Sequence, residues 1–159
     1  MEIKTEALKM KKSAPVLAAS TMEQRNLALQ LIAGALEENK AVIFEANQQD
    51  MAYAESNGVA QATQKRLKYD EKKLQDSING VLELKELSDP IGKVLMNRQL
   101  DEGLILKKIT VPIGVIGVIF EARPNVTVDA AALCLKSGNT VILRGGKEAI
   151  NSNKAMAEI

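Results

Sequence analysis

Apolar residues recur at helical spacing over the first half of the chain, and this pattern predicts a helical region over residues 1–88. One apolar stripe comprises Leu29, Ile32, Ala33 and Leu36. Residues with that spacing share one face of a helix. Ser20 and Glu23 match a capping box at the start of this helix, with Ser20 as the N-cap.

Further helices are expected along the same region. Asn39 is placed to cap one of them, and Asn57-Gly58 to end it, because these residues tolerate the left-handed conformation. Another helix follows Asp70, and its inner side is marked by Leu74, Ile78, Val81, Leu82 and Leu84. The mixed charges from Lys65 to Lys73 fit an interaction patch or a solvated helix face, and we favour the solvated face.

The pattern changes to strands after Pro90. Two strand-like segments within residues 94–111 flank Asp101-Glu102-Gly103, a connection that predicts a β-hairpin. The edges of this hairpin expose backbone N–H and C=O groups that need hydrogen-bond partners. We therefore expect it to pack poorly against residues 112–159.

Residues 112–159 alternate between strand and helix. The apolar runs Val115–Phe120 and Thr140–Leu143 predict strands covered on both faces. Between them a helix starts at Pro124 and ends at Gly138, and residues from Lys147 onward are again helical. This βαβα order implies a parallel sheet. The predicted fold class is α/β: a helical N-terminal region, a β-hairpin and the start of a doubly wound parallel sheet.

The amino-acid composition excludes several classes of functional site. The 159 residues suit one domain, carry a net charge of +1, and contain no histidine and one cysteine, Cys134. Catalytic triads, His-built metal sites and internal disulfides are therefore excluded within this chain, and no metal is expected. With a nearly neutral charge balance, the chain lacks the excess of Lys and Arg that is typical of nucleic-acid-binding proteins. No membrane span or signal peptide is visible, so a cytoplasmic location is expected.

Two segments could carry chemistry. In Leu143–Glu148 a glycine turn joins a strand to a helix, where backbone N–H groups with Arg144 and Lys147 could bind an anion. The alternative is a plain turn with incidental charges. The spacing fits neither a Walker A loop nor a Rossmann fingerprint. Asn125 follows the first buried strand and could donate to an oxyanion, or it could cap nearby backbone groups.

Residues 111–131 and 137–146 closely resemble the glutamate-5-semialdehyde dehydrogenase family, also called gamma-glutamyl phosphate reductase, a branch of the aldehyde dehydrogenase superfamily. The segment Ser20–Asn26 resembles the same family, so the likeness spans essentially the whole chain. It implies NADPH-dependent reduction of L-glutamate 5-phosphate, an acyl phosphate, to the 5-semialdehyde and phosphate in proline biosynthesis. The chain is then the N-terminal part of the NADP-binding domain, a fragment that lacks the catalytic domain.

The resemblance also implies site residues. Asn125 matches the asparagine that helps hold the oxyanion. The expected cofactor residues are Arg144, Gly145, Gly146, Lys147 and Glu148. Arg144 stands near the adenosine ribose, and Lys147 replaces a residue that is usually small, adding positive charge. Glu148 stands near the carboxylate that meets the ribose hydroxyls in NAD-preferring relatives. The complete enzyme is expected to form a homo-oligomer.

Cys134 is expected to be structural. Its helix is apolar around most of its circumference, and burial disfavours the thiolate. The family's nucleophilic cysteine lies beyond residue 159, so this chain alone is expected to be inactive. A non-catalytic nucleotide-binding fragment and an interaction module built on the helical front and the hairpin remain alternatives.

Overall fold

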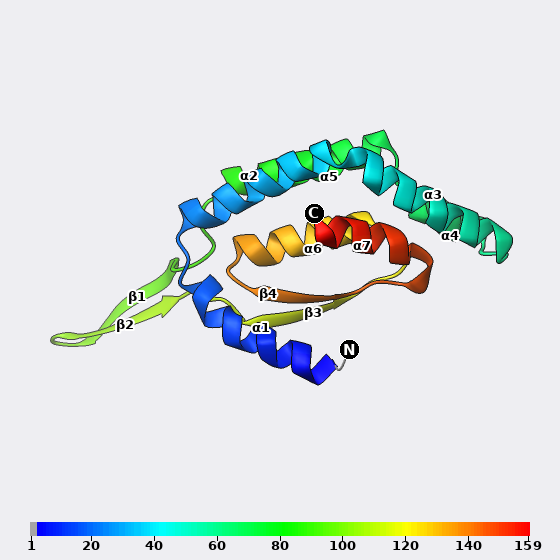
Figure 1. Cartoon of the computed structure of the whole chain (residues 1–159). Helices are drawn as coiled ribbons and strands as arrows, with labels where there is room; N and C mark the ends of the chain where they lie inside the picture. The colour runs from blue at the N-terminus through cyan, green and yellow to red at the C-terminus, as the bar shows by residue number, and fades with distance from the viewer. Residues whose placement is uncertain (1–2) are drawn as a thin grey trace.

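The computed structural model describes residues 3–159. Its helices are α1 (Ile3–Ala18), α2 (Met22–Glu38), α3 (Lys40–Ser56), α4 (Gln61–Leu67), α5 (Glu71–Glu86), α6 (Asn125–Lys136), the 3₁₀ turn η1 (Lys147–Ala149) and α7 (Ile150–Glu158). Its strands are β1 (Val94–Asp101), β2 (Leu104–Ile109), β3 (Val115–Ile119) and β4 (Thr140–Arg144). Helices α2 and α5 form an outer layer, α6 and α7 lie beneath it, and β3 and β4 lie between these and α1 (Figure 1).

The predicted apolar faces are confirmed. The buried core that joins α2, α5 and α6 includes Leu29, Leu36, Leu74, Val81 and Val128. The helix after Asp70 also begins as expected, since the Asp70 side chain accepts a hydrogen bond from the backbone N–H of Lys73. No helix among residues 3–159 has both the length and the apolar character needed to cross a membrane.

The predicted capping box is wrong by one residue. Thr21 is the N-cap of α2: its hydroxyl accepts the backbone N–H of Gln24 at 3.2 Å, and its own backbone N–H donates to the Gln24 side-chain oxygen at 2.9 Å. Ser20 instead binds the end of the preceding helix α1, because its hydroxyl donates to the Leu17 carbonyl at 2.6 Å. Adjacent Ser and Thr residues, each followed three residues later by Glu or Gln, offer two capping boxes one residue apart, and only the end of α1 decides between them.

Two helix-end predictions have different outcomes. Gly58 has a φ of +65° immediately after the C-cap Asn57, so the predicted end of α3 is confirmed. Asn39 occupies the N-cap position of α3, but its side chain makes no cap there. Its amide donates to the Ala35 carbonyl at 2.8 Å, which places the interaction at the end of α2.

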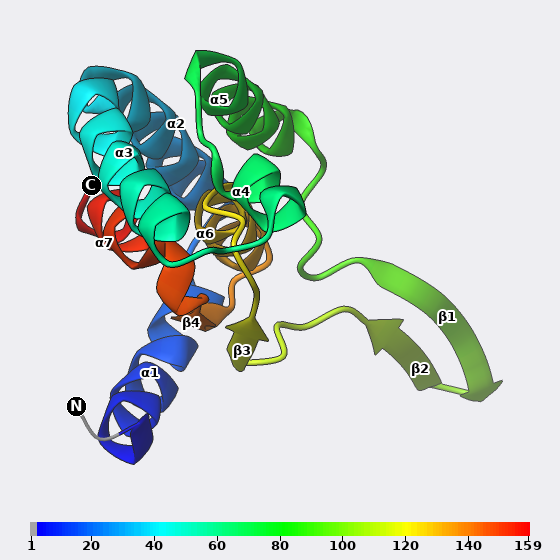
Figure 2. The same ribbon diagram turned by 90° about the vertical axis from the view of Figure 1, so that its right-hand side faces the viewer.

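The hairpin is present, with a shorter connection than predicted. Asp101 pairs with Leu104, so Glu102 and Gly103 alone connect the antiparallel strands, with Gly103 at a φ of +74°. Every residue of both strands is exposed, and the hairpin projects away from the layers (Figure 2). This exposure agrees with the expectation of poor packing against residues 112–159.

The parallel βαβ unit is confirmed, but the burial of its strands is not. Strands β3 and β4 pair in parallel from Val115↔Thr140 to Ile119↔Arg144, joined by α6. Gly117 and Ile119 are exposed, the latter to 86%, and most of the other strand residues are half-buried. The reason is that β3 and β4 form a sheet of only two strands within residues 3–159.

Candidate functional site

The carboxyl ends of β3 and β4 lie at the same edge of the sheet, and the turns that follow them touch. The backbone N–H of Phe120 donates to the Arg144 carbonyl at 3.1 Å. A Cβ on Gly145 would overlap the amide of Asn153 and lie 3.2 Å from the Phe120 ring. Ligands of open α/β sheets bind outside this edge, so the position of the turn fits the predicted site. The need for glycine at position 145 is nevertheless explained by packing within the chain.

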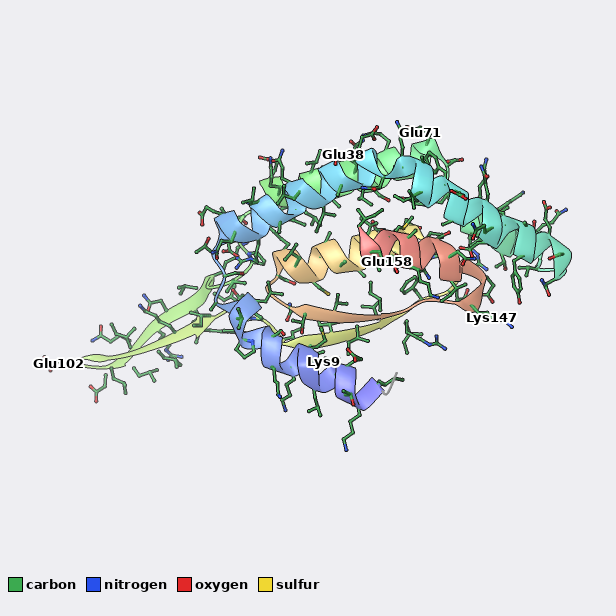
Figure 3. The ribbon with its side chains drawn as sticks, in the orientation of Figure 1. Lys9, Glu38, Glu71, Glu102, Lys147 and Glu158 are labelled. Carbon is green, nitrogen blue, oxygen red and sulfur yellow. The ribbon has the colours of Figure 1, made fainter. Side chains whose placement is uncertain are left out.

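The predicted cationic residues face outward at this edge. Arg144 and Lys147 are exposed, and Lys147 lies at the end of the molecule opposite the hairpin (Figure 3). Among the residues that the structure describes, no carboxylate lies within ion-pair distance of either side chain. Glu148 is half-buried, and its carboxylate lies against Gly146. Two cations and one carboxylate are thus available to a ligand here.

The N-terminus of α7, which follows the predicted anion site, is already used within the chain. The Asp50 carboxylate of α3 accepts the backbone N–H groups of Asn151 at 3.1 Å and of Ser152 at 2.8 Å. It also accepts their side chains, at 2.9 and 2.6 Å. An anion therefore already occupies the N-terminus of α7. The predicted site at Leu143–Glu148, with the cationic side chains of Arg144 and Lys147, is not part of this contact.

Sequence reasoning missed this buried polar contact. Asp50 is 1% exposed, and Asn47 beside it is also buried. The Asn47 amide donates to the Leu67 carbonyl at 2.9 Å and to the Ser152 hydroxyl at 3.1 Å, and accepts the Tyr69 N–H at 2.8 Å. The available signal was the spacing: Asn47 and Asp50 continue the buried stripe that includes Ile43 and Ala54.

Asn125 is the first residue of α6. Its amide Nδ2 donates to Asp129 Oδ2 at 2.9 Å, so the alternative in which it caps backbone groups is not what the structure shows. A cavity of about 210 Å³ is lined by Lys73, Asp76, Ser77, Asn125 and Asp129. None of the five predicted cofactor residues lines this cavity. The predicted oxyanion donor and the predicted cofactor turn thus do not line a common cavity within residues 3–159.

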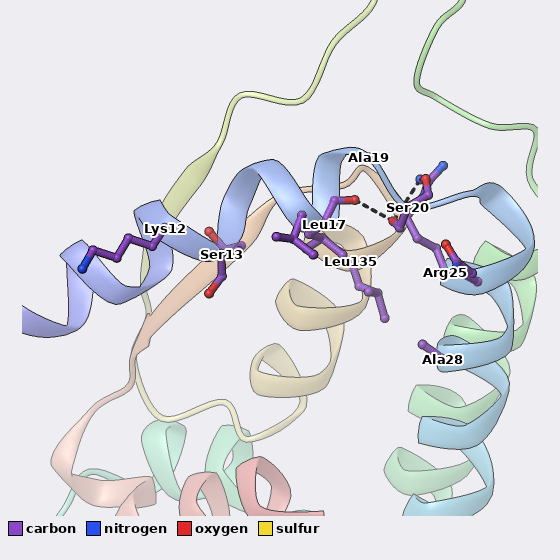
Figure 4. A pocket seen from close by; sticks show the side chains of 11 residues that line it. Lys12, Ser13, Leu17, Ala19, Ser20, Arg25, Ala28 and Leu135 are labelled. Atoms are coloured by element: carbon purple, nitrogen blue, oxygen red, sulfur yellow. Dashed lines mark hydrogen bonds between the residues drawn. The ribbon is translucent and has the colours of Figure 1, made fainter.

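A larger cavity of about 820 Å³ lies between α1, α2 and α6 (Figure 4) and contains none of the predicted residues. Its buried cation, Arg25, is already engaged: it donates to the Ser20 carbonyl and pairs with both Asp89 oxygens at 2.8 and 2.7 Å. Half of the other ten residues that line it are apolar. Size alone does not make this cavity the site.

Cys134 is buried at 6% exposure, and burial raises the pKa of its thiol. The nearby Lys136 is also buried, and its ammonium donates to Asn26 Oδ1 at 2.8 Å and the Lys85 carbonyl at 3.2 Å. The Lys136 ammonium group thus contacts Asn26 and Lys85 instead of the Cys134 thiol. Residues 3–159 hold no group of three or more His, Cys, Asp or Glu side chains placed to bind a metal ion.

Comparison with known proteins identifies relatives of this chain. No protein-family model matches it. A curated gamma-glutamyl phosphate reductase from Carboxydothermus hydrogenoformans is 48% identical over 158 residues, 99% of this chain and 38% of the relative. The crystal structure of gamma-glutamyl phosphate reductase from Thermotoga maritima superposes with a TM-score of 0.95 at 39% identity, covering 99% of this chain and 38% of that one.

A more distant structure shares the fold. A Bacillus subtilis protein named as an aldehyde dehydrogenase matches with a TM-score of 0.68 at 24% identity, over 94% of this chain and 31% of that one. The chain spans 38% of the length of the reductases named above. Over essentially its whole length, the chain is thus a homologue of part of gamma-glutamyl phosphate reductase, with an aldehyde dehydrogenase-like fold.

Proposed function

We propose that this chain forms the N-terminal part of the NADP-binding domain of a gamma-glutamyl phosphate reductase. The complete enzyme would use NADPH to reduce L-glutamate 5-phosphate to L-glutamate 5-semialdehyde and phosphate, a step of proline biosynthesis. The observation that carries the proposal is the 48% identity to the Carboxydothermus reductase over 99% of the chain. No observation favours the non-catalytic fragment or the interaction module over this reading.

The exposed cations at the carboxyl edge fit the cofactor. Arg144 and Lys147 have no anionic partner among residues 3–159, and a phosphate group beside them would form charge-assisted hydrogen bonds. Glu148 offers a carboxylate that can accept from ribose hydroxyls. Because Gly145 and Gly146 lack side chains, the turn can pack directly against the side chains of Asn153 and Glu148. When bound, NADPH supplies the hydride.

The chain's own residues would orient the acyl group and leave the nucleophile to be supplied elsewhere. Asn125 carries two N–H groups on its amide; one is donated to Asp129, and the other is proposed to stabilise the oxyanion. Cys134 is the only cysteine in 159 residues, and burial raises its pKa. We therefore propose that the thiolate comes from outside these residues and that this chain alone does not turn over.

We also propose a cellular location and an oligomeric state for the complete enzyme. A net charge of +1 gives no general attraction to nucleic acid, and small-molecule biosynthesis fits a cytoplasmic location. The exposed strands β1 and β2 offer unpaired edges, which support a homo-oligomer in the complete enzyme.

A grafted enzyme tests the function. The matching 158 residues of the Carboxydothermus reductase are replaced by this chain, and the graft is expressed in bacteria that require proline because they lack the reductase. We expect growth without proline. The host enzyme is the positive control, and the 159-residue chain alone should not restore growth. A folded graft that fails to support growth would refute the proposal.

A further inference from the structure

The small cavity between α5 and α6 has a built, polar lining. Its volume of about 210 Å³ lies below the roughly 300–1,000 Å³ of pockets for drug-sized ligands, so it suits a small polar group. Lys73, Asp76 and Ser77 come from α5, and Asn125 and Asp129 from α6. The cavity thus brings two carboxylates to the residue that is proposed to hold the oxyanion.

Neither carboxylate is neutralised by the chain. Asp129 is half-buried and accepts a hydrogen bond only from Asn125, and no cation within residues 3–159 forms an ion pair with Asp129 or Asp76. Lys73 is the one cation in the lining, and its ammonium donates instead to the carbonyls of Arg66 at 3.0 Å, Lys65 at 3.4 Å and Lys68. The lining therefore carries two carboxylates and one ammonium group, which is hydrogen-bonded elsewhere.

The buried Tyr69 hydroxyl contacts Ser77, which lines the cavity. It donates to Ser77 Oγ at 2.9 Å, at the wall of the cavity. The pKa of Tyr69 is raised, first by burial and then by the charges of Asp129 and Asp76, against the hydrogen bond to Ser77. Burial likewise raises the pKa of Asp129, against the hydrogen bond from Asn125. Asp129 is thus half-buried, whereas Asp76 is exposed. A half-buried carboxylate that lines a cavity and lacks a cation is a candidate for a ligand site.

We infer that this cavity binds the α-ammonium group of the amino-acid substrate, with Asp129 and Asp76 as its acceptors. The inference rests on the proposed function. Asn125 and Asp129 are one turn apart on the same face of α6, about 6 Å along the helix axis. In a glutamyl chain only three carbon–carbon bonds separate the acyl carbon from the α-carbon. One short substrate can therefore place its acyl group at Asn125 and its ammonium group at Asp129.

This arrangement makes Asp129 and Asp76 specificity-determining residues. A substrate that lacks the amino group would leave the carboxylates without their cation, and sites built to bind a polar group reject analogues without it. Asn125 is fixed by the same contact, since its hydrogen bond to Asp129 sets which way the amide points. Recognition of the amino acid and orientation of the oxyanion donor are thus coupled.

The test is an NMR titration of the 159-residue chain, following the backbone amides of Ser77, Asn125 and Asp129. The probes are L-glutamate, 4-aminobutyrate, which keeps an ammonium group, and glutarate, which has none. We expect saturable shifts with the first two and none with glutarate. D129N and D76N should each weaken L-glutamate binding by roughly tenfold or more, as loss of a charge-assisted contact predicts.

Two controls make every outcome decisive. E83Q removes an exposed carboxylate of α5 outside the cavity and should leave binding unchanged, and D129E should restore part of the loss. An equal response to glutarate, undiminished binding by D129N, or no response to L-glutamate would overturn the inference. The reductase proposal is judged separately by growth of the graft, so a growing graft with a failed titration rejects the subsite alone.

Discussion

Asp50 and Asp129 are two carboxylates that the same fold treats in opposite ways. Asp50, at the contact of α3 with α7, is 1% exposed and accepts hydrogen bonds from two backbone N–H groups and two side chains. Asp129, in the cavity between α5 and α6, accepts one hydrogen bond, from Asn125. The first carboxylate is fully satisfied, and the second retains capacity for a partner that the chain does not supply.

The difference separates a structural charge from a binding charge. A buried carboxylate is tolerated when hydrogen bonds and a helix N-terminus compensate its lost hydration, as they do for Asp50. Asp129 lacks that compensation, and its pKa is raised by burial. Proteins commonly accept such a cost at functional sites.

Removal of Asp50 should have the largest effect. Asp50→Ala leaves two backbone N–H groups and the Ser152 hydroxyl without their acceptor. A buried group left unsatisfied costs about 1–3 kcal/mol, so we expect the free energy of unfolding to fall by at least about 3 kcal/mol. Chemical denaturation measures it. Asp101→Ala in the exposed hairpin is the control and should change stability by no more than about 0.5 kcal/mol. A loss in Asp50→Ala as small as the control's would show that Asp50 is not a structural charge.

Arg144 and Lys147 are exposed cations and, like Asp129, have no ion-pair partner among residues 3–159. We predict that replacing both with Ala in the grafted enzyme lowers the preference for NADPH over NADH by more than about tenfold, because each loses a charge-assisted contact. The ratio of kcat/KM for the two cofactors measures this. Stability should be unaffected, since both side chains are exposed. An unchanged cofactor ratio would show that the adenosine site lies elsewhere.

Cys134 should behave as a core residue. Its burial and raised pKa predict alkylation at neutral pH at least roughly tenfold slower than that of a free thiol, limited by opening of the fold. Mass spectrometry of the native chain follows the modification. Cys134→Ser in the grafted enzyme should leave kcat unchanged. Fast alkylation, or lost turnover in a folded variant, would contradict this role.

Asp129→Asn should change stability by much less than Asp50→Ala, and with the opposite sign. A carboxyl whose pKa is raised in the folded state destabilises that state once it is ionised. The variant should therefore melt higher than the parent at pH 7, by on the order of 2 °C. The gain should vanish near about pH 3, below the ordinary carboxyl pKa. A lower melting temperature at pH 7 would mean that the charge stabilises the fold.

The sequence predicts the elements better than it predicts the polar contacts. The periodicity of Leu29 to Leu36 and the apolar runs around α6 give the helices and the parallel strands, because burial follows local spacing. The occupied N-terminus of α7 could not be foreseen, since Asp50 lies about a hundred residues before it in the chain. The pairing of Asn125 with Asp129 is local, but its cavity needs Asp76 and Ser77 from another helix.

The most direct test of the account is the reaction itself in the purified grafted enzyme. Oxidation of NADPH is followed by absorbance on addition of freshly prepared L-glutamate 5-phosphate, with the unmodified Carboxydothermus enzyme as reference. We predict a rate that depends on the acyl phosphate and exceeds the rate of the same graft carrying Asn125→Ala by about a hundredfold or more. A folded graft that oxidises no NADPH, or whose rate is insensitive to Asn125, would contradict the account.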